Sequence, residues 1–588
     1  MKSFLKYTLA TIVGVIITGL IFFLILFASI GSMISKQDAP VEIKPNTIVR
    51  MDLNHLIMDR SPQNPFQNFN FGSFKPSKTL GLNDILNNIE KAKKDNDIKG
   101  IYLDLSTIPA GMATIEEIRN ALIDFKESEK FIICYSDTYD QMSYYLGSVA
   151  DKVYMNPEGR IFLTGLQSEV MFFKEGLDKL GVEPQIIRHG KFKSAIEPFT
   201  KNEMSPENRT QIMAYITALW DQMAKGISEQ RGIELEKVNQ ITNELSMRNA
   251  QDAVEMGFVD GLKYKDEIIE ELKEKSEIDK KEPRFVTLGK YNRVPEIKEY
   301  KGLAKEKVAV VYAMGSVIMG EGEEGSIGSD RISRAIRQAR EDSTVKAIVF
   351  RVNSGGGSAL ASEVIWREAK LAAQEKPFIA SLGDVAASGG YYIVAPADTI
   401  MASPNTITGS IGVFGLFFNS KEFLNDKLGV HVDVAKTHEY ADIMSPFRPM
   451  TGSERRIIKE GIEDTYDVFI KHVAEGRNMT TEKVDEIGQG RVWSGTDAKR
   501  IGLIDMYGGL EEAIALAAEK ANLEKYRTLN LPKLKDPFQQ FMKELSGGVQ
   551  SSIIKKQLGE NYKYYKQFEE IKEMRGIQAR IPYRIDVY

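Results

Sequence analysis

The sequence predicts an α/β protein built as a tandem duplication of one domain. Helical and strand patterns alternate from Leu82 onward, which is typical of parallel strands joined by crossover helices. The same series of patterns returns later in the chain, and matching residues keep a nearly fixed separation. The 588 residues are 43% hydrophobic and 27% charged, a composition that favours packed domains over disorder.

The N-terminus carries a long apolar segment. Residues 7–35 form a run of 29 residues without a charge, long enough to cross a bilayer. A cleaved signal peptide usually has an apolar core of about 7 to 15 residues, so we favour an uncleaved anchor, although small residues at 28–32 keep cleavage open. Lys2 and Lys6 precede the run, and the positive-inside rule therefore places the N-terminus in the cytoplasm and the rest across the membrane.

The duplication is visible as pairs of matching residues. Four pairs lie 247 positions apart, and two further pairs lie 248 and 245 apart. They are Lys99 with Lys346, Asp137 with Asp384, Tyr144 with Tyr391, Pro157 with Pro404, Pro198 with Pro446 and Gly257 with Gly502. Such spacing over so long a stretch is hard to obtain by chance.

These observations divide the chain into five parts. We expect a cytoplasmic N-terminus and transmembrane anchor at 1–36, a first α/β repeat at 37–270, a charged linker at 271–306, a second repeat at 307–530 and a C-terminal extension at 531–588. The extension falls outside the repeat, and the sequence assigns it no role.

Composition also excludes some classes of function. The net charge of −5 and the dispersed basic residues do not indicate a basic surface that would bind nucleic acid. The single cysteine, Cys134, excludes an intramolecular disulfide framework and a multi-cysteine metal site.

Ser388 is the candidate nucleophile. It lies between two alanines and two glycines in the stretch 383–392, where small neighbours let a reacting carbonyl approach and let Gly389 offer its N–H. An ordinary tight turn that opens a helix explains this string equally well. The first copy has Gln141 at the matching position, so it cannot perform this chemistry alone.

Lys193 is the candidate base. A serine hydroxyl needs a base within hydrogen-bond reach, and Lys193 of the first copy matches Ala441 of the second. To act in a Ser-Lys pair, the lysine must be neutral, and lowering its pKa from about 10.4 to about 7 or 8 costs roughly 3 to 5 kcal/mol, which burial must supply. His189 and His438 lie near the compared segments and keep a Ser-His arrangement open.

Acyl transfer also needs donors for an oxyanion. Three consecutive glycines at 355–357 form a glycine triplet. The candidate donors are the N–H of Gly389 and one amide of this triplet, Gly357 or Gly356, with Gly357 preferred. Ser410 is a candidate to hold the lysine amine by a hydrogen bond, although a turn or helix cap explains it too. We expect neither a metal nor an organic cofactor.

Four stretches together carry a family resemblance. They are residues 192–199, 353–358, 383–392 and 408–412, and they resemble the signal peptide peptidase A family in its long, duplicated Gram-negative form. The resemblance covers almost the whole chain. The glycine triplet departs from it, because a proline often precedes two glycines in the family, and this leaves open whether Gly356 or Gly357 is the donor.

The resemblance implies a fold, a mechanism and partners. It implies a crotonase-like or Clp-protease-like domain and a membrane-anchored endopeptidase with Ser388 as nucleophile, Lys193 as base and Ser410 orienting the lysine. It further implies a homotetramer on the periplasmic side of the inner membrane that degrades signal peptides and other unfolded apolar peptides. Two alternatives remain open, a crotonase-type acyl-CoA enzyme and a catalytically silent membrane scaffold.

Overall fold

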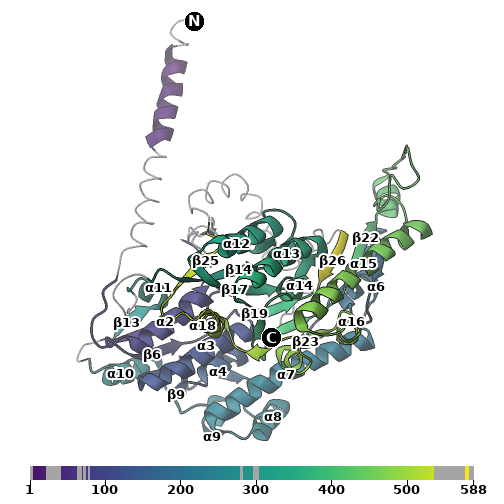
Figure 1. Cartoon of the computed structure of the whole chain (residues 1–588). Coiled ribbons are helices and arrows are strands. Elements are labelled where there is room, and N and C mark those ends of the chain that lie inside the picture. Colours follow the sequence, from purple (N-terminus) through teal and green to yellow (C-terminus); the bar gives the residue numbers. More distant parts are fainter. Residues whose placement is uncertain are drawn as a thin grey trace.

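Two sheets with the same strand order form the centre of the chain in the computed structural model (Figure 1). The structure describes residues 4, 6–21, 41–61, 69–70, 75–76, 80–278, 282–295, 304–534 and 576–581. The first sheet runs β12-β9-β7-β6-β1-β13, and the second contains the path β24-β20-β19-β17-β14-β25. Neighbouring strands along both paths are parallel. The matching orders support the duplication that the sequence predicts.

The strands of the two sheets correspond one to one. In the first sheet they are β1 (Thr47–Met51), β6 (Ile98–Asp104), β7 (Phe131–Ser136), β9 (Lys152–Met155), β12 (Gly261–Leu262) and β13 (Arg284–Thr287). In the second they are β14 (Lys307–Met314), β17 (Val345–Ser354), β19 (Phe378–Ala387), β20 (Thr399–Ala402), β24 (Met506–Tyr507) and β25 (Arg527–Leu531). The central strands are nearly continuous apolar runs, because helices cover a parallel sheet on both faces.

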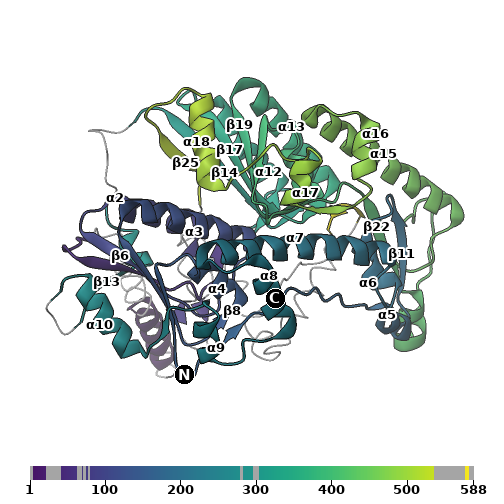
Figure 2. The same ribbon diagram turned by 90° about the horizontal axis from the view of Figure 1, so that it is seen from below.

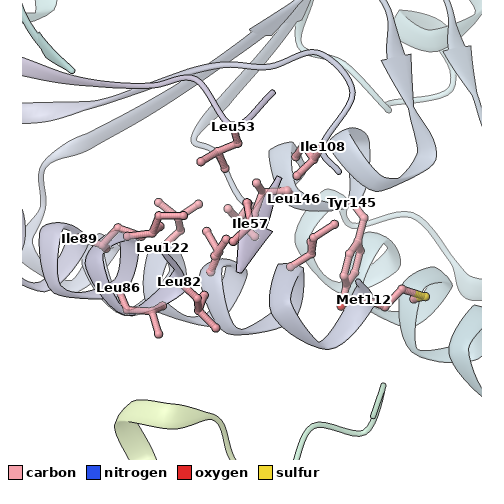
Figure 3. Close-up of a cluster of buried hydrophobic side chains, with 14 of the residues drawn as sticks. Leu53, Ile57, Leu82, Leu86, Ile89, Ile108, Met112, Leu122, Tyr145 and Leu146 are labelled. Carbon is pink, nitrogen blue, oxygen red and sulfur yellow. The ribbon is translucent and has the colours of Figure 1, made fainter. Parts of the chain in front are cut away.

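Helices α2 (Leu82–Lys94) and α3 (Met112–Phe125) pack side by side in the first repeat. In α2, Leu82, Leu86 and Ile89 recur at helical spacing and point into a cluster of buried side chains (Figure 3). That spacing places them on one face of the helix. Burial of this face holds α3 against α2. Helix α3 also contacts β19 of the second sheet.

The two repeats interlock near the glycine-rich segments. Strand β11 (Glu183–Arg188) of the first repeat pairs antiparallel with β22 (Phe414–Asn419) of the second. Helix α7 (Pro206–Arg231) crosses beneath the second repeat (Figure 2) and contacts β23 (Val492–Ser494). The segment that follows β11, which contains Lys193, is thereby placed inside the second repeat.

The two ends of the repeats include strands that the sequence did not indicate. Strand β13 lies within 271–306, the expected linker, and forms the edge of the first sheet beside β1. Strand β26 (Gly576–Arg580) lies within 531–588 and pairs with β22 and with β18 (Gly356–Ser358). Both segments therefore contribute backbone to a sheet.

The predicted anchor is described only in part. Residues 6–21 are helical and mostly exposed, whereas residues 22–40 lie outside the described part of the chain. Within the described ranges, no helix has both the length and the apolar character needed to cross a bilayer. The transmembrane helix stays a prediction.

Candidate active site

Ser388 lies in a sharp turn between β19 and α14 (Gly389–Val394). Its backbone adopts φ 56° and ψ −118°, a strained conformation for a residue with a side chain. The Ser388 N–H donates to the carbonyl of Gly409 at 2.8 Å, which holds the turn against strand β21 (Ile407–Gly409). The side chain is fully buried. Strain of this kind persists only where the surroundings impose it, as they do at many active sites.

Lys193 reaches Ser388 from the other repeat. The Phe192 N–H donates to the carbonyl of Gln489 at 3.0 Å, and the Lys193 backbone packs on Gly490 so closely that a Cβ there would lie 2.6 Å from the Lys193 nitrogen. The Lys193 Nζ then lies 2.8 Å from the Ser388 Oγ. The structure thus brings the two candidate residues into hydrogen-bond distance.

The surroundings of Lys193 favour a neutral amine. The side chain is fully buried, and this burial lowers the pKa of Lys193 well below its usual value. Among the described residues, no carboxylate offsets this effect of burial on the Lys193 pKa. An uncompensated charge in such a place would cost several kcal/mol, which favours the neutral form of the amine.

Ser410 supplies two acceptors to the lysine. The Lys193 Nζ donates to the Ser410 carbonyl and to the Ser410 Oγ, both at 3.1 Å. Ser410 has φ 50°, and its N–H donates to the Arg491 carbonyl at 2.7 Å. A neutral amine has two N–H donors and one lone pair. With both donors on Ser410, the lone pair is left for the Ser388 hydroxyl.

The glycines surround the other side of Ser388. A Cβ on Gly356 would lie 2.7 Å from the Gly389 nitrogen, and a Cβ on Gly389 would lie 3.1 Å from the Gly357 nitrogen. The three residues are therefore in close contact, and side chains there would fill the space between them. The Gly356 N–H already donates to the Ser354 Oγ at 3.0 Å. This contact favours Gly357 over Gly356 as the partner of Gly389.

The two histidines considered from the sequence have other neighbours. The ring of His189 stacks on Tyr466 with a centroid distance of 4.0 Å. His438 is exposed, and its Nδ1 lies 2.9 Å from the Thr437 Oγ1. Among the described side chains, the hydrogen-bond partner of the Ser388 Oγ is Lys193. The geometry therefore favours a Ser-Lys arrangement over a Ser-His one.

Two supporting residues were not singled out from the sequence. The Ser354 Oγ donates to the Gly315 carbonyl at 2.6 Å and so orients the glycine triplet. Asp384 accepts from the N–H of Thr114 at 2.9 Å and from its hydroxyl at 2.7 Å, which ties β19 to the first repeat. Asp384 stands out in the sequence only as a residue repeated from Asp137.

A strained buried serine beside backbone N–H groups and a lysine whose pKa is lowered by burial is an arrangement suited to acyl transfer. The class that this fold and site define is that of the serine hydrolases. The model of "Peptidase family S49" matches residues 124–279 and again 370–524. The chain belongs to this family, and the double match confirms the duplication.

Individual relatives agree with this assignment. Protease 4 of Haemophilus influenzae is 36% identical over 465 residues, which cover 77% of this chain and 74% of that protein. The chloroplastic serine protease SPPA of Arabidopsis thaliana is 33% identical over 510 residues, which cover 85% and 74%. These findings confirm the resemblance seen in the sequence. The chain is a serine endopeptidase.

Among solved structures, a ClpP1 mutant from Listeria monocytogenes is similar over 35% of this chain and 94% of its own, with 15% identity and a TM-score of 0.24.

Proposed function

We propose that the chain is a membrane-anchored endopeptidase that cleaves peptides with a Ser388–Lys193 dyad. The observation that carries the proposal is the 2.8 Å distance between the Lys193 Nζ and the Ser388 Oγ, inside a site that excludes charge. Because the base is neutral at rest, it can accept a proton without prior ionisation of the serine.

The first half of the reaction forms an acyl-enzyme. The Ser388 Oγ attacks the carbonyl carbon of the peptide while its proton passes to the Lys193 Nζ. The carbonyl oxygen gains negative charge and is stabilised by the N–H groups of Gly389 and Gly357. The C–N bond then breaks, and the Lys193 ammonium gives its proton to the departing amine.

Water completes the cycle in the second half. Lys193, neutral again, takes a proton from a water molecule as that molecule attacks the ester on Ser388. The product leaves with a new carboxylate, and Lys193 returns the proton to the Ser388 Oγ. Ser410 keeps the amine in line through both halves by means of its two acceptors.

The proposed substrates are signal peptides and other unfolded apolar peptides. Strands β18 and β22 border the site, and both pair with β26, so an extended peptide would use their backbone groups in place of that strand. A cleaved signal peptide stays near the bilayer, so an anchored enzyme meets it at high local concentration.

The proposed location is the inner membrane, with one span and the catalytic repeats in the periplasm. Support comes from the uncharged run at 7–35 and from the exposed apolar side chains of its described part, such as Leu9, Val15 and Ile16. Carbonate extraction of membranes from cells that make the full chain should leave it in the pellet. A variant without residues 1–36 should appear in the supernatant.

We further propose a homotetramer. The segment 428–447 exposes apolar side chains that include Val430, Val432 and Phe447, and apolar surface of this kind is commonly covered by a partner. Light scattering of the purified chain in detergent measures the mass directly. A monomeric mass at micromolar concentration would contradict the tetramer without touching the dyad.

Hydrolysis of a fluorogenic apolar peptide tests the activity. Ser388→Ala and Lys193→Ala should each lower kcat/KM by at least about 10³-fold, because members of a catalytic unit fail together. Lys191→Ala is the matched control, since Lys191 is exposed and only two residues away. Full activity in either dyad variant, with circular dichroism unchanged, would exclude the mechanism. A silent scaffold would show no hydrolysis in the wild type.

A further inference from the structure

Lys193 is the central residue of a tight three-residue turn. Its backbone adopts φ −73° and ψ 75°, and the Ser194 N–H donates to the Phe192 carbonyl at 2.7 Å. These are the dihedral angles and the hydrogen bond of an inverse γ-turn. One hydrogen bond contributes little net stability in water, yet this turn sets the direction in which the Lys193 side chain leaves the backbone. The approach of the amine to Ser388 therefore depends on what holds the turn.

The side-chain amide of Gln211 contacts both ends of this turn. Gln211 lies in α7 and is 1% exposed. Its Nε2 donates to the Ser194 Oγ at 2.8 Å and to the Phe192 carbonyl at 3.2 Å. It also lies 3.1 Å from the Asn208 Oδ1 of the same helix. Because an amide nitrogen has two N–H donors, this one side chain can bridge the residues before and after Lys193.

The other end of the amide reaches the second repeat. The Gln211 Oε1 accepts from the Val492 N–H of β23 at 3.2 Å. A backbone N–H can only donate, so this contact requires the amide oxygen at β23 and the amide nitrogen at the turn. Helix α7 crosses beneath the second repeat and contacts β23, which brings the amide to both partners (Figure 2). A single buried side chain thus joins the Lys193 turn of one repeat to a strand of the other.

Strand β23 also lies beside the backbone that holds the nucleophile. Val492 is opposite Gly409 in the antiparallel pair of β23 and β21. The Gly409 carbonyl in turn accepts from the Ser388 N–H at 2.8 Å. The contact of Gln211 with β23 therefore fixes the Lys193 turn relative to the same backbone that places the nucleophile.

The second repeat has an apolar residue at the position that corresponds to Gln211. Helix α15 (Gly452–Arg477) is the counterpart of α7, because both have 26 residues. The N-cap residues Ser205 and Thr451 are 246 positions apart, and so are the two C-cap residues. The same separation matches Gln211 with Ile457, which is 44% exposed. The helix therefore does not require an amide there, and the copy that lacks the lysine also lacks the amide.

We propose that Gln211 is a positioning residue that fixes the turn around Lys193 and thereby directs the amine to Ser388. The inference rests on the proposed dyad and adds to it a residue that touches neither the substrate nor the reacting atoms. Without the amide, the turn loses the contacts at both of its ends and its link to β23. The Lys193 side chain can then leave its buried position between Ser388 and Ser410, and a lysine that reaches water keeps its proton up to a higher pH.

Gln211→Met tests the role of the amide, because methionine is similar in length but has no N–H donor and only a weak acceptor. With a fluorogenic apolar peptide, kcat should fall about 10- to 100-fold while KM stays unchanged. The low-pH limb of the kcat profile should also move upward by about one pH unit or more. A folded variant with unchanged kcat would overturn the proposal. A loss of kcat by the same factor at every pH would overturn it too, because a merely structural residue would give that result.

Ser194→Ala decides the question if the methionine variant does not fold. It removes one acceptor of the amide and keeps the amide itself, so kcat should fall about three- to tenfold with a shift of the pH profile in the same direction. Wild-type kinetics in Ser194→Ala would contradict the proposal. In the double variant, the loss should not exceed that of Gln211→Met alone, since both changes act on one contact. Fully additive losses would show that the two side chains act independently and would overturn the bridge.

Two further variants complete the experiment. Gln240→Met, exposed on α8 (Leu235–Glu244), is the matched control and should keep wild-type kinetics. Lys193→Ala separates failure of this inference from failure of the proposed function. If Lys193→Ala is inactive and Gln211→Met keeps the wild-type kcat, the dyad stands and the role of Gln211 is overturned. If Lys193→Ala keeps full activity, the dyad is overturned and the positioning role with it.

Discussion

The Nζ of Lys193 lies 2.8 Å from the Oγ of Ser388, although the two residues belong to different copies of a duplicated domain. The contact exists because β11 of the first copy pairs with β22 of the second. This pairing places Lys193, which follows β11 in the chain, next to Ser388 of the second copy. Neither copy contains both groups. Under the proposed mechanism, activity therefore depends on how the two copies dock.

The rate of peptide hydrolysis should fall as pH falls through the native pKa of Lys193. Burial lowers this pKa well below the usual value of 10.5, and protonation removes the lone pair that accepts the serine proton. The plateau of kcat/KM should therefore begin well below pH 10.5. A pH profile with circular dichroism at each point measures this. A rate that rises only above about pH 10 would mean that the amine is charged at rest.

Replacement of Lys193 should change the pH dependence of stability. The unfolded chain binds a proton at this lysine up to a pKa of about 10.4, whereas burial lowers the native pKa, so the native chain releases the proton at a lower pH. Between the native and unfolded pKa values, the unfolding free energy therefore rises with pH, by about 1.4 kcal/mol per unit from this group. Lys193→Met lacks this contribution, so the variant should be the more stable chain near neutral pH.

Urea unfolding of the wild type and Lys193→Met at several pH values measures this difference. The advantage of the methionine variant should shrink by about 1.4 kcal/mol for each unit that the pH rises toward 10.4. Other titrating groups are common to both chains and cancel in the difference. An advantage that stays constant with pH would show that the native lysine keeps its proton.

Ser410→Ala should lower kcat and leave KM unchanged. The Ser410 Oγ contacts the Lys193 amine at 3.1 Å, so Ser410 acts as a positioning residue, while its carbonyl remains in the variant. Loss of one hydrogen bond is worth about 0.5 to 1.5 kcal/mol, or up to about tenfold in rate. Steady-state kinetics, with Ser453→Ala in the first turn of α15 (Gly452–Arg477) as a control, separates the two parameters. A rise in KM at constant kcat would place Ser410 in substrate binding instead.

The sequence predicted the duplication and the proximity of Ser388 and Lys193 for one physical reason. Two copies of one domain provide an internal comparison, and the residues in which they differ, such as Ser388 against Gln141, are those that the fold itself does not require. The choice between Gly356 and Gly357 could not be made in this way. It depends on the orientation of the Ser354 hydroxyl, which only the folded chain fixes.

Contacts between segments far apart in the chain could not be predicted from the sequence for a related reason. Asp59 and Arg351 are 292 positions apart, and neither stands out in its own segment. Strand β26 is five residues long and isolated in the sequence, so no periodicity marks it as a strand. Its pairing comes entirely from the free edges of β18 and β22. Local patterns predict elements, whereas contacts between distant segments follow from docking.

Arg351→Met should destabilise the docking of the two repeats. The Arg351 side chain is fully buried, and its Nε and Nη2 donate to Asp59 and Glu117 of the first repeat, both at 2.7 Å. Removing the cation leaves two buried carboxylates uncompensated, which should lower the unfolding free energy by about 3 to 5 kcal/mol. Urea unfolding, with the exposed Arg367→Met as control, measures the loss. A loss below about 1 kcal/mol would mean that the ion pairs of Arg351 contribute little to the docking of the repeats.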